Sequence, residues 1–168
     1  MAANVKPVPE GCHTLTAHIV VKDASKAIEF YQRAFGAKSH GGIFKTPDGK
    51  VMHAELEIGD SRLMLADEFP GMGSGKSPQT LGGTTTTLNI YVEDVDRLFN
   101  QAVAAGATVA MPLANQFWGD RYGQVSDPFG HSWALGQHVE DVAPEEMERR
   151  AKEMFAQMAK KTATAQRA

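Results

Sequence analysis

The chain has 168 residues, of which 42% are hydrophobic and 22% are charged, and its formal net charge is −3. At this length folding buries roughly two-thirds of the surface that the unfolded chain exposes, which suits one compact domain. The net negative charge argues against a nucleic-acid partner, because phosphate binding needs concentrated Lys and Arg. The sequence contains no apolar run of about eighteen residues, so we expect no membrane partner.

Cysteine content and the N-terminal residues indicate a reducing compartment. The single cysteine, Cys12, has no partner for an internal disulfide, and it excludes a zinc site built from several cysteines. Residues 1–11 contain prolines and charges in place of the apolar stretch of a signal peptide. We therefore expect a cytoplasmic protein.

A first strand–helix–strand pattern follows an N-terminal lead of residues 1–13 and spans 14–70. A strand-like run at 18–21 precedes a helix that begins at the capping residue Asp23 and ends at Gly36. The helix has an apolar face made of Ala27, Ile28, Tyr31 and Phe35. Three strands are expected after it, at 39–45, 51–58 and 62–66, separated by the turns 47–49 and 59–60.

The same pattern returns in residues 85–142, after a Gly-rich linker at 71–84. Acidic residues Glu93 and Asp94 begin the second helix and Gly106 ends it. The expected strands lie at 88–92, 108–114, 121–126 and 132–137. Two copies of one strand, one helix and three strands indicate an internal repeat.

The sequence predicts a third helix and a tail at the C-terminal residues 143–168. Pro144 suits the first helical position. An apolar stripe at helical spacing consists of Met147, Ala151, Met154, Phe155 and Met158. The stripe packs on its own domain or on a second subunit, or it forms a Met-rich lid over a ligand.

Four sequence fragments together resemble the vicinal-oxygen-chelate superfamily, within it the PhnB-like and bleomycin-resistance-like branch. They are Ala27-Ile-Glu-Phe-Tyr31 with Phe35-Gly-Ala37, Trp118-Gly-Asp-Arg-Tyr-Gly123 and Asp127-Pro-Phe-Gly-His131. The resemblance covers about residues 15–142 and implies an α+β fold of two tandem βαβββ modules with open curved sheets. Its members include glyoxalase I, extradiol dioxygenases and metal-free proteins that bind bleomycin-type drugs, and many members are dimers.

The enzymes of this family hold a divalent metal with His or Gln on the opening strand of each module and Glu on its closing strand. The matching positions of this sequence are Thr16, Thr87, Met64 and Ala134. Met64 and Ala134 offer a hard cation no oxygen, so we expect no cofactor. An alternative is a displaced site for Zn, Ni, Fe or Mn made of His18, Glu68 and His138, in which the repeat relates Glu68 to His138.

No other catalytic constellation is present in the sequence, and we assign no catalytic residue. Cys12 has no helix start that lowers the pKa of a thiol. A Gly-x-Ser-x-Gly motif is also absent from the sequence. The sequence therefore contains no motif that requires catalytic turnover.

A ligand-binding site is easier to motivate, because the loop at 117–122 combines three aromatic residues with one guanidinium. Such a set suits a planar, partly polar or anionic ligand. The candidate ligand-binding residues are Trp118, Arg121, Tyr122, His18, Met64, Met111 and Trp133. Alternatively, Trp118 and Tyr122 plug the barrel mouth, Arg121 pairs with Asp120 or Asp127, and Trp133 belongs to the core.

Three functions remain open from the sequence. The first is a metal-free protein that binds a small aromatic or partly polar compound. The second is a metal-dependent lyase or dioxygenase of glyoxalase type that uses the displaced ligands. The third is a non-catalytic structural homodimer whose pocket is filled by its own side chains.

Overall fold

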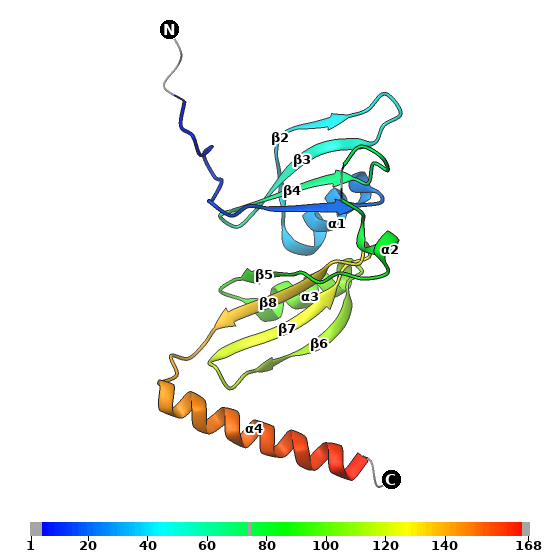
Figure 1. Ribbon diagram of the computed structural model, residues 1–168. Coiled ribbons are helices and arrows are strands. Elements are labelled where there is room, and N and C mark those ends of the chain that lie inside the picture. Colours follow the sequence, from blue (N-terminus) through cyan, green and yellow to red (C-terminus); the bar gives the residue numbers. More distant parts are fainter. Residues whose placement is uncertain (1–4, 74, 166–168) are drawn as a thin grey trace.

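The computed structural model describes residues 5–73 and 75–165, and it shows two modules of one design followed by a long helix (Figure 1). Residues 1–4 of the predicted lead, residue 74 of the predicted linker and residues 166–168 of the predicted tail lie outside the described residues. The first module consists of β1 (Ala17–Val21), α1 (Ala24–Phe35), β2 (Lys38–Lys45), β3 (Val51–Ile58) and β4 (Ser61–Asp67). The second consists of β5 (Thr87–Tyr91), α3 (Val95–Ala105), β6 (Thr108–Asn115), β7 (Asp120–Ser126) and β8 (Ser132–His138). The predicted α+β class and its C-terminal helix, α4 (Pro144–Ala165), are confirmed.

Local capping explains where helices α1 and α3 begin and end. The side chain of Asp23 accepts the Lys26 amide at the start of α1, and Asp94 does the same for Arg97 in α3. Gly36 follows α1 in the left-handed region with φ of 67°, which a side chain disfavours. These caps lie where the sequence predicts them.

One further helix lies in the segment that the sequence predicts to be a linker. This short helix, α2 (Pro78–Leu81), follows Ser77, whose side chain accepts the Thr80 amide. Pro78 suits its first turn. The amide hydrogens of a first turn have no helix carbonyl to bond, and proline has no amide hydrogen. Glycine-rich composition therefore conceals one ordered turn between the modules.

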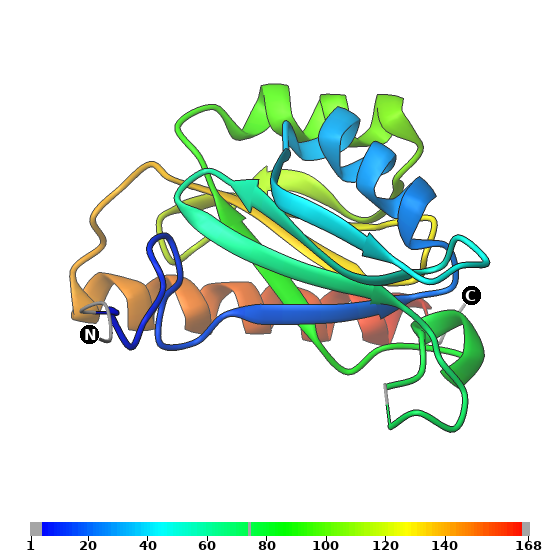
Figure 2. The same ribbon diagram turned by 90° about the horizontal axis from the view of Figure 1, so that it is seen from above.

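Each module forms a four-stranded sheet, in the orders β1-β4-β3-β2 and β5-β8-β7-β6. The opening strand of each module pairs in parallel with the closing strand, and the other neighbours are antiparallel. Helices α1 and α3 contact each other, and Figure 2 shows them side by side. One face of each sheet packs on these helices.

The core lies between the two helices and the helix-facing side of each sheet. Tyr31, Leu65 and Leu135 are fully buried there. The rings of Phe35 and Trp133 lie 4.6 Å apart between centroids, so the first helix contacts the second sheet directly. Burial of such aromatic pairs joins the two modules into one hydrophobic core.

The opposite side of each sheet, here called its open face, points away from α1 and α3. Strand alternation and register place one row of side chains across the open face of the first sheet: His18, Met64, Glu55 and His40. The corresponding row of the second sheet contains Asn89, Ala134, Gln124 and Met111. Two of the four positions that the family resemblance assigns to metal ligands, Met64 and Ala134, lie in these rows.

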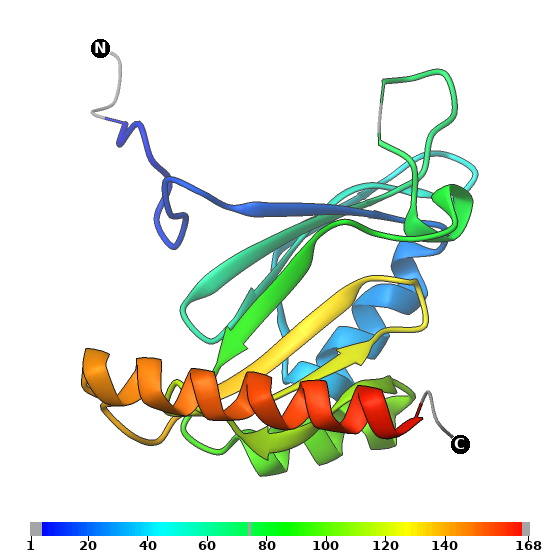
Figure 3. The same cartoon turned by 60° about the horizontal axis from the view of Figure 1, so that its bottom comes forward.

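Helix α4 runs along the second module, away from the first (Figures 1 and 3). Arg150 binds Glu140 in the preceding segment through two hydrogen bonds of 2.8 Å. Met147 and Met154 are half-buried, whereas Phe155 is 61% exposed. The predicted apolar stripe is therefore only partly covered within one chain. Among the described residues, no helix is both long and apolar enough to span a membrane.

Candidate functional site

A buried carboxylate organises the aromatic residues at one end of the second sheet. Asp120 is 5% exposed, and its Oδ2 accepts hydrogen bonds from Tyr91 Oη at 2.8 Å and from Trp118 Nε1 at 2.9 Å. Its Oδ1 lies 2.9 Å from His138 Nδ1. Because Asp120 is the first residue of β7, the strand fixes the carboxylate on the open face.

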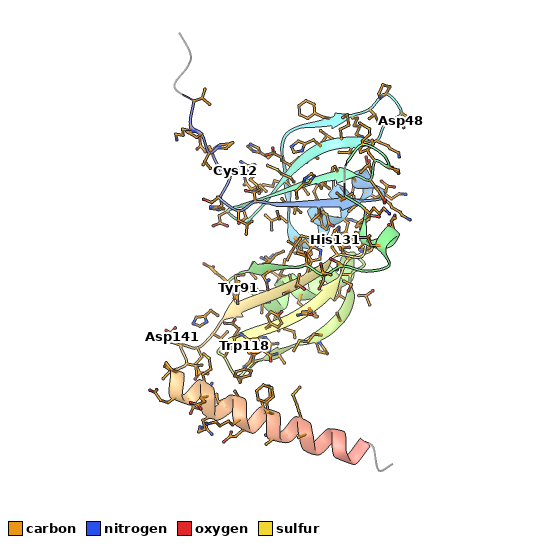
Figure 4. All side chains as sticks on the ribbon, in the orientation of Figure 1. Cys12, Asp48, Tyr91, Trp118, His131 and Asp141 are labelled. Carbon is orange, nitrogen blue, oxygen red and sulfur yellow. The ribbon has the colours of Figure 1, made fainter. Side chains whose placement is uncertain are left out.

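The aromatic rings around Asp120 form a connected group. Trp118 meets Tyr122 edge to face at 5.6 Å between centroids, and it meets Phe117 edge to face at 5.1 Å. Figure 4 places Trp118 and Tyr91 in the second module, at the end where Asp141 leads into α4. Tyr91 is 61% exposed, and Trp118 and Tyr122 are half-buried. The group therefore offers partly exposed rings held in fixed orientations.

The charges in this cluster are mutually stabilised. Burial raises the pKa of Asp120, but hydrogen bonds from His138, Tyr91 and Trp118 outweigh it and leave the pKa below its ordinary value. A hydrogen bond to Asp141, followed by the bond to Asp120, raises the pKa of His138. The imidazole lies between two carboxylates, 3.0 Å from Asp141 Oδ1 through Nε2. This arrangement favours a charged histidine that positions Asp120.

Arg121 corrects one expectation, because it lies on the other face of β7. Its guanidinium binds Asp96 of α3, through Nε at 2.6 Å and Nη2 at 2.5 Å. The sequence analysis gives Asp120 or Asp127 as alternative ion-pair partners, and the structure shows Asp96 in their place. Side chains alternate along a strand, so Arg121 points to the helix side while Asp120 and Tyr122 share the open face.

The other predicted ligand-binding residues divide between the two sheets. His18 and Met64 lie on the open face of the first sheet, and Met111 lies opposite Gln124 on the open face of the second. Trp133 is 2% exposed, in agreement with the core alternative, and its Nε1 donates to Asp127 at 2.9 Å. The structure thus does not gather all seven residues around one pocket.

The displaced metal site is also not assembled within the chain. Glu68 accepts hydrogen bonds from Ser77 and Thr80 beside α2, while His138 belongs to the Asp120 cluster of the second module. His18 lies on β1, where burial and then the charge of His53 lower its pKa. Among the described residues, no group of three or more His, Cys, Asp or Glu side chains is placed to hold a metal ion.

The positions that carry metal ligands in the resembled family do not fit a hard cation either. Met64 and Ala134 lie on the open faces, in register with His18 and Asn89 respectively. A thioether and a methyl group supply no oxygen. Thr16 directly precedes β1 and Thr87 is the first residue of β5, and the Oγ1 of each donates a hydrogen bond to another protein atom.

Two cavities border the junction of the modules. A groove of about 1020 Å³ lies between β1 and the segment that leads into β5, and His18 lines it. A smaller cavity of about 220 Å³ lies beside it, with Trp133 among its lining residues. Figure 4 shows His131 between the two modules, where its Nε2 donates to the carbonyl of Val20 at 3.2 Å. His131 thus ties the second module to the edge of the groove.

Sequence reasoning overlooked three residues that shape these sites. Asp120 and Tyr91 organise the aromatic group, and Arg62 borders both cavities. The alternation that separates Asp120 and Tyr122 from Arg121 is readable in the sequence once the strand is placed. The pairing of Tyr91 with Asp120 is not, since it joins two different strands.

Solved structures share this architecture. TioX from Micromonospora sp. ML1 is 28% identical, with a TM-score of 0.60 over 76% of this chain and 99% of TioX. A PhnB protein from Bacillus cereus is 20% identical, with a TM-score of 0.58 over 74% of this chain and 99% of that chain, and it shows the fold alone. The tandem modules with open sheet faces therefore define a two-module protein of the vicinal-oxygen-chelate type.

The sequence comparisons agree with this class. The chain belongs to the Glyoxalase/Bleomycin resistance protein/Dioxygenase superfamily, whose sequence pattern matches residues 13–135. It is 49% identical over 150 residues to the uncharacterized protein Rv0887c of Mycobacterium tuberculosis, covering 88% of this chain and 84% of that protein. It is 30% identical over 132 residues to YjdN of Escherichia coli, covering 67% of this chain and 86% of YjdN.

Proposed function

We propose that this chain binds a small planar molecule, aromatic or partly polar, on the open face of its second sheet, without a metal. The aromatic group of Trp118, Tyr122 and Tyr91 is the observation that carries the proposal. Aromatic faces stack on planar ligands, and hydrogen-bonding groups at their rim orient polar substituents. Because Asp120 fixes two of the rings, fewer side-chain conformations are lost on binding.

The residues at the family's metal-ligand positions support binding without a metal. Metal chemistry in this superfamily requires ligands that converge from several strands. Thr16, Met64, Thr87 and Ala134 stand at those positions of this chain. The same substitutions speak against a lyase or dioxygenase that polarises paired substrate oxygens, and no catalytic residue is assigned.

We further propose that the protein is a cytoplasmic homodimer. Enclosing a ligand requires a cover over the open faces. All eight residues of β2, Phe44 among them, are exposed within one chain, as is Phe155 of α4. A second copy can cover such surfaces and complete the enclosure.

Titration calorimetry with naphthalene-2-carboxamide, a neutral planar probe, tests the proposal. Trp118→Ala removes a stacking surface and is expected to weaken binding by about 1–3 kcal/mol. Arg121→Lys is the matched control, because this side chain binds Asp96 on the opposite face and its replacement should leave the affinity unchanged. A cooperative melting transition first confirms that both variants are folded.

Two results would overturn the proposal. Equal affinity of Trp118→Ala and the parent would place the ligand elsewhere. Binding of no planar probe by a folded parent protein would favour the purely structural dimer.

A further inference from the structure

The groove between the modules has an unusual charge pattern. Its lining, all within the described residues, includes Arg62, Lys76, His13, His18 and His131 but no Asp or Glu. Hydroxyl groups are frequent in the same lining, at Thr16, Ser61 and the run Thr84–Thr87. A concave surface with cationic and hydroxyl groups and no carboxylate attracts anions.

Arg62 and His131 are the buried members of this set. The Arg62 side chain is 7% exposed, and Nη1 is buried without a hydrogen-bond partner. The nearest carboxylate oxygen is Glu57 Oε2, 3.6 Å from Nη1, which is beyond hydrogen-bond distance. A buried guanidinium nitrogen without a hydrogen-bond acceptor is costly even with a carboxylate 3.6 Å away, so an added acceptor in the groove is favoured.

The N-terminal lead covers the guanidinium from one side. The backbone at Gly11 approaches so closely that an added Cβ would lie 2.7 Å from Arg62 Nη2 and 2.8 Å from Nε. Gly11 also adopts a φ of 77°, which disfavours any side chain. The chain thus buries Arg62 beneath backbone and leaves it bordering the groove.

The remainder of the groove is apolar and partly exposed. Leu15 and Leu81 line it, and they are 90% and 64% exposed. Ile19, Val20 and Leu88 add further aliphatic lining. A hydrocarbon body can bury this surface while a charged head reaches Arg62.

We propose that the groove between β1 and the segment leading into β5 binds an amphipathic carboxylate with an aliphatic body, oriented by Arg62. The planar guanidinium matches a carboxylate through paired hydrogen bonds. The volume of about 1020 Å³ accommodates a small organic anion. This site is separate from the aromatic group of the second sheet and does not depend on the function proposed there.

Calorimetry with octanoate and octanamide, which share the aliphatic body and differ in the charged head, tests this site. Octanoate is expected to bind the parent at least ten-fold more tightly than octanamide. Arg62→Met keeps an unbranched side chain without the guanidinium and should lower the octanoate affinity at least ten-fold, with octanamide unchanged. Arg97→Met is the matched control, since Arg97 is 74% exposed on α3 and should bind octanoate as the parent does.

Stability gives a second measurement on the same variants. Arg62→Met removes a buried charge whose Nη1 lacks a hydrogen bond and leaves behind a partly exposed Glu57, so its melting temperature should equal or exceed that of the parent. If this variant does not fold, Arg62→Lys keeps the charge without the planar fork and should lose at least three-fold in octanoate affinity. Equal binding of octanoate and octanamide by the parent, or unchanged octanoate binding by Arg62→Met or Arg62→Lys, would overturn the site. Trp118→Ala should not alter octanoate binding, which separates this test from that of the aromatic group.

Discussion

Tyr31 Oη donates a hydrogen bond of 2.7 Å to Asp127 Oδ2 and so joins the helix of the first module to the turn before β8. Asp127 is buried and also accepts from Trp133 Nε1 and from the amides of Phe129 and His131. Burial, together with the nearby carboxylate, raises the pKa of Tyr31 well above its ordinary value. One carboxylate therefore organises the junction of the modules.

Tyr31→Phe should destabilise the protein by about 1.5–3 kcal/mol, because a hydrogen bond to a buried carboxylate is lost. Urea denaturation followed by circular dichroism measures the change in the free energy of unfolding. Tyr122→Phe is the control, since its Oη accepts only a half-buried hydrogen bond from Gln124 and should cost about 0.5–1.5 kcal/mol. A smaller loss for Tyr31→Phe than for the control would show that the junction does not depend on this bond.

The second prediction concerns His138, whose pKa is raised by Asp141 and then by Asp120. A folded-state pKa above the unfolded value means that the stabilisation is complete below the unfolded pKa and is lost as the pH rises through the folded pKa. His138→Asn should therefore lower the melting temperature more at about pH 5 than at about pH 9. His40→Asn, on the exposed strand β2, is the control and should show the same small change at both values.

Titration of the imidazole signals by NMR checks the cause of this pH dependence. The pKa of His138 should lie above the ordinary histidine value and fall in Asp141→Asn, because the largest stabilising bond is removed. The pKa of His18 should lie below that value, since burial disfavours its charged form. An unchanged His138 pKa in Asp141→Asn would contradict the assignment.

The third prediction is that a chelator leaves the melting temperature unchanged. Thr16, Met64, Thr87 and Ala134 stand where the superfamily's enzymes carry ligands, so removal of free metal should not affect the fold. Thermal denaturation with and without EDTA makes the comparison, with metal analysis of the purified protein. About one equivalent of a divalent metal per chain would refute the prediction, and loss of that metal in His18→Ala would then locate it.

The fourth prediction is a homodimer at micromolar concentration. Light scattering should give about twice the 18.2 kDa mass of one chain. If the apolar side of α4 contributes to the interface, Phe155→Glu should shift the mass toward the monomer, because Phe155 is 61% exposed in one chain. Lys152→Ala, at an exposed position of the same helix, is the control and should leave the mass unchanged. A parent mass of 18.2 kDa would exclude the dimer.

Much of the fold follows from local signals in the sequence. Asp23 and Gly36 bracket α1 because a capping carboxylate and a left-handed glycine act within one helical turn. The alternation around Leu63 and Leu65 likewise predicts which face of β4 is buried. Such signals need no knowledge of distant residues, and the two modules were predicted from them.

The site was harder to predict, as Trp118 and Arg121 illustrate. The two residues lie three positions apart, and the sequence predicts that both side chains contact one ligand, Trp118 by stacking and Arg121 by its charge. Strand β7 begins at Asp120, so Arg121 faces α3 and binds Asp96 while Trp118 binds Asp120 on the open face. A change of one residue in strand phase exchanges the two faces, and a sequence pattern rarely fixes a strand start that closely.

The sequence alone predicted the repeat and the bounds of α1 and α3, because each depends on residue type and short-range spacing. Only the tertiary structure decided that Tyr31 meets Asp127, that Asp120 joins Tyr91 to Trp118, and that Arg62 is buried beside a groove without carboxylates. These contacts join residues from separate elements. They depend on how the two modules pack their helices and edge strands together, and no local pattern encodes that packing.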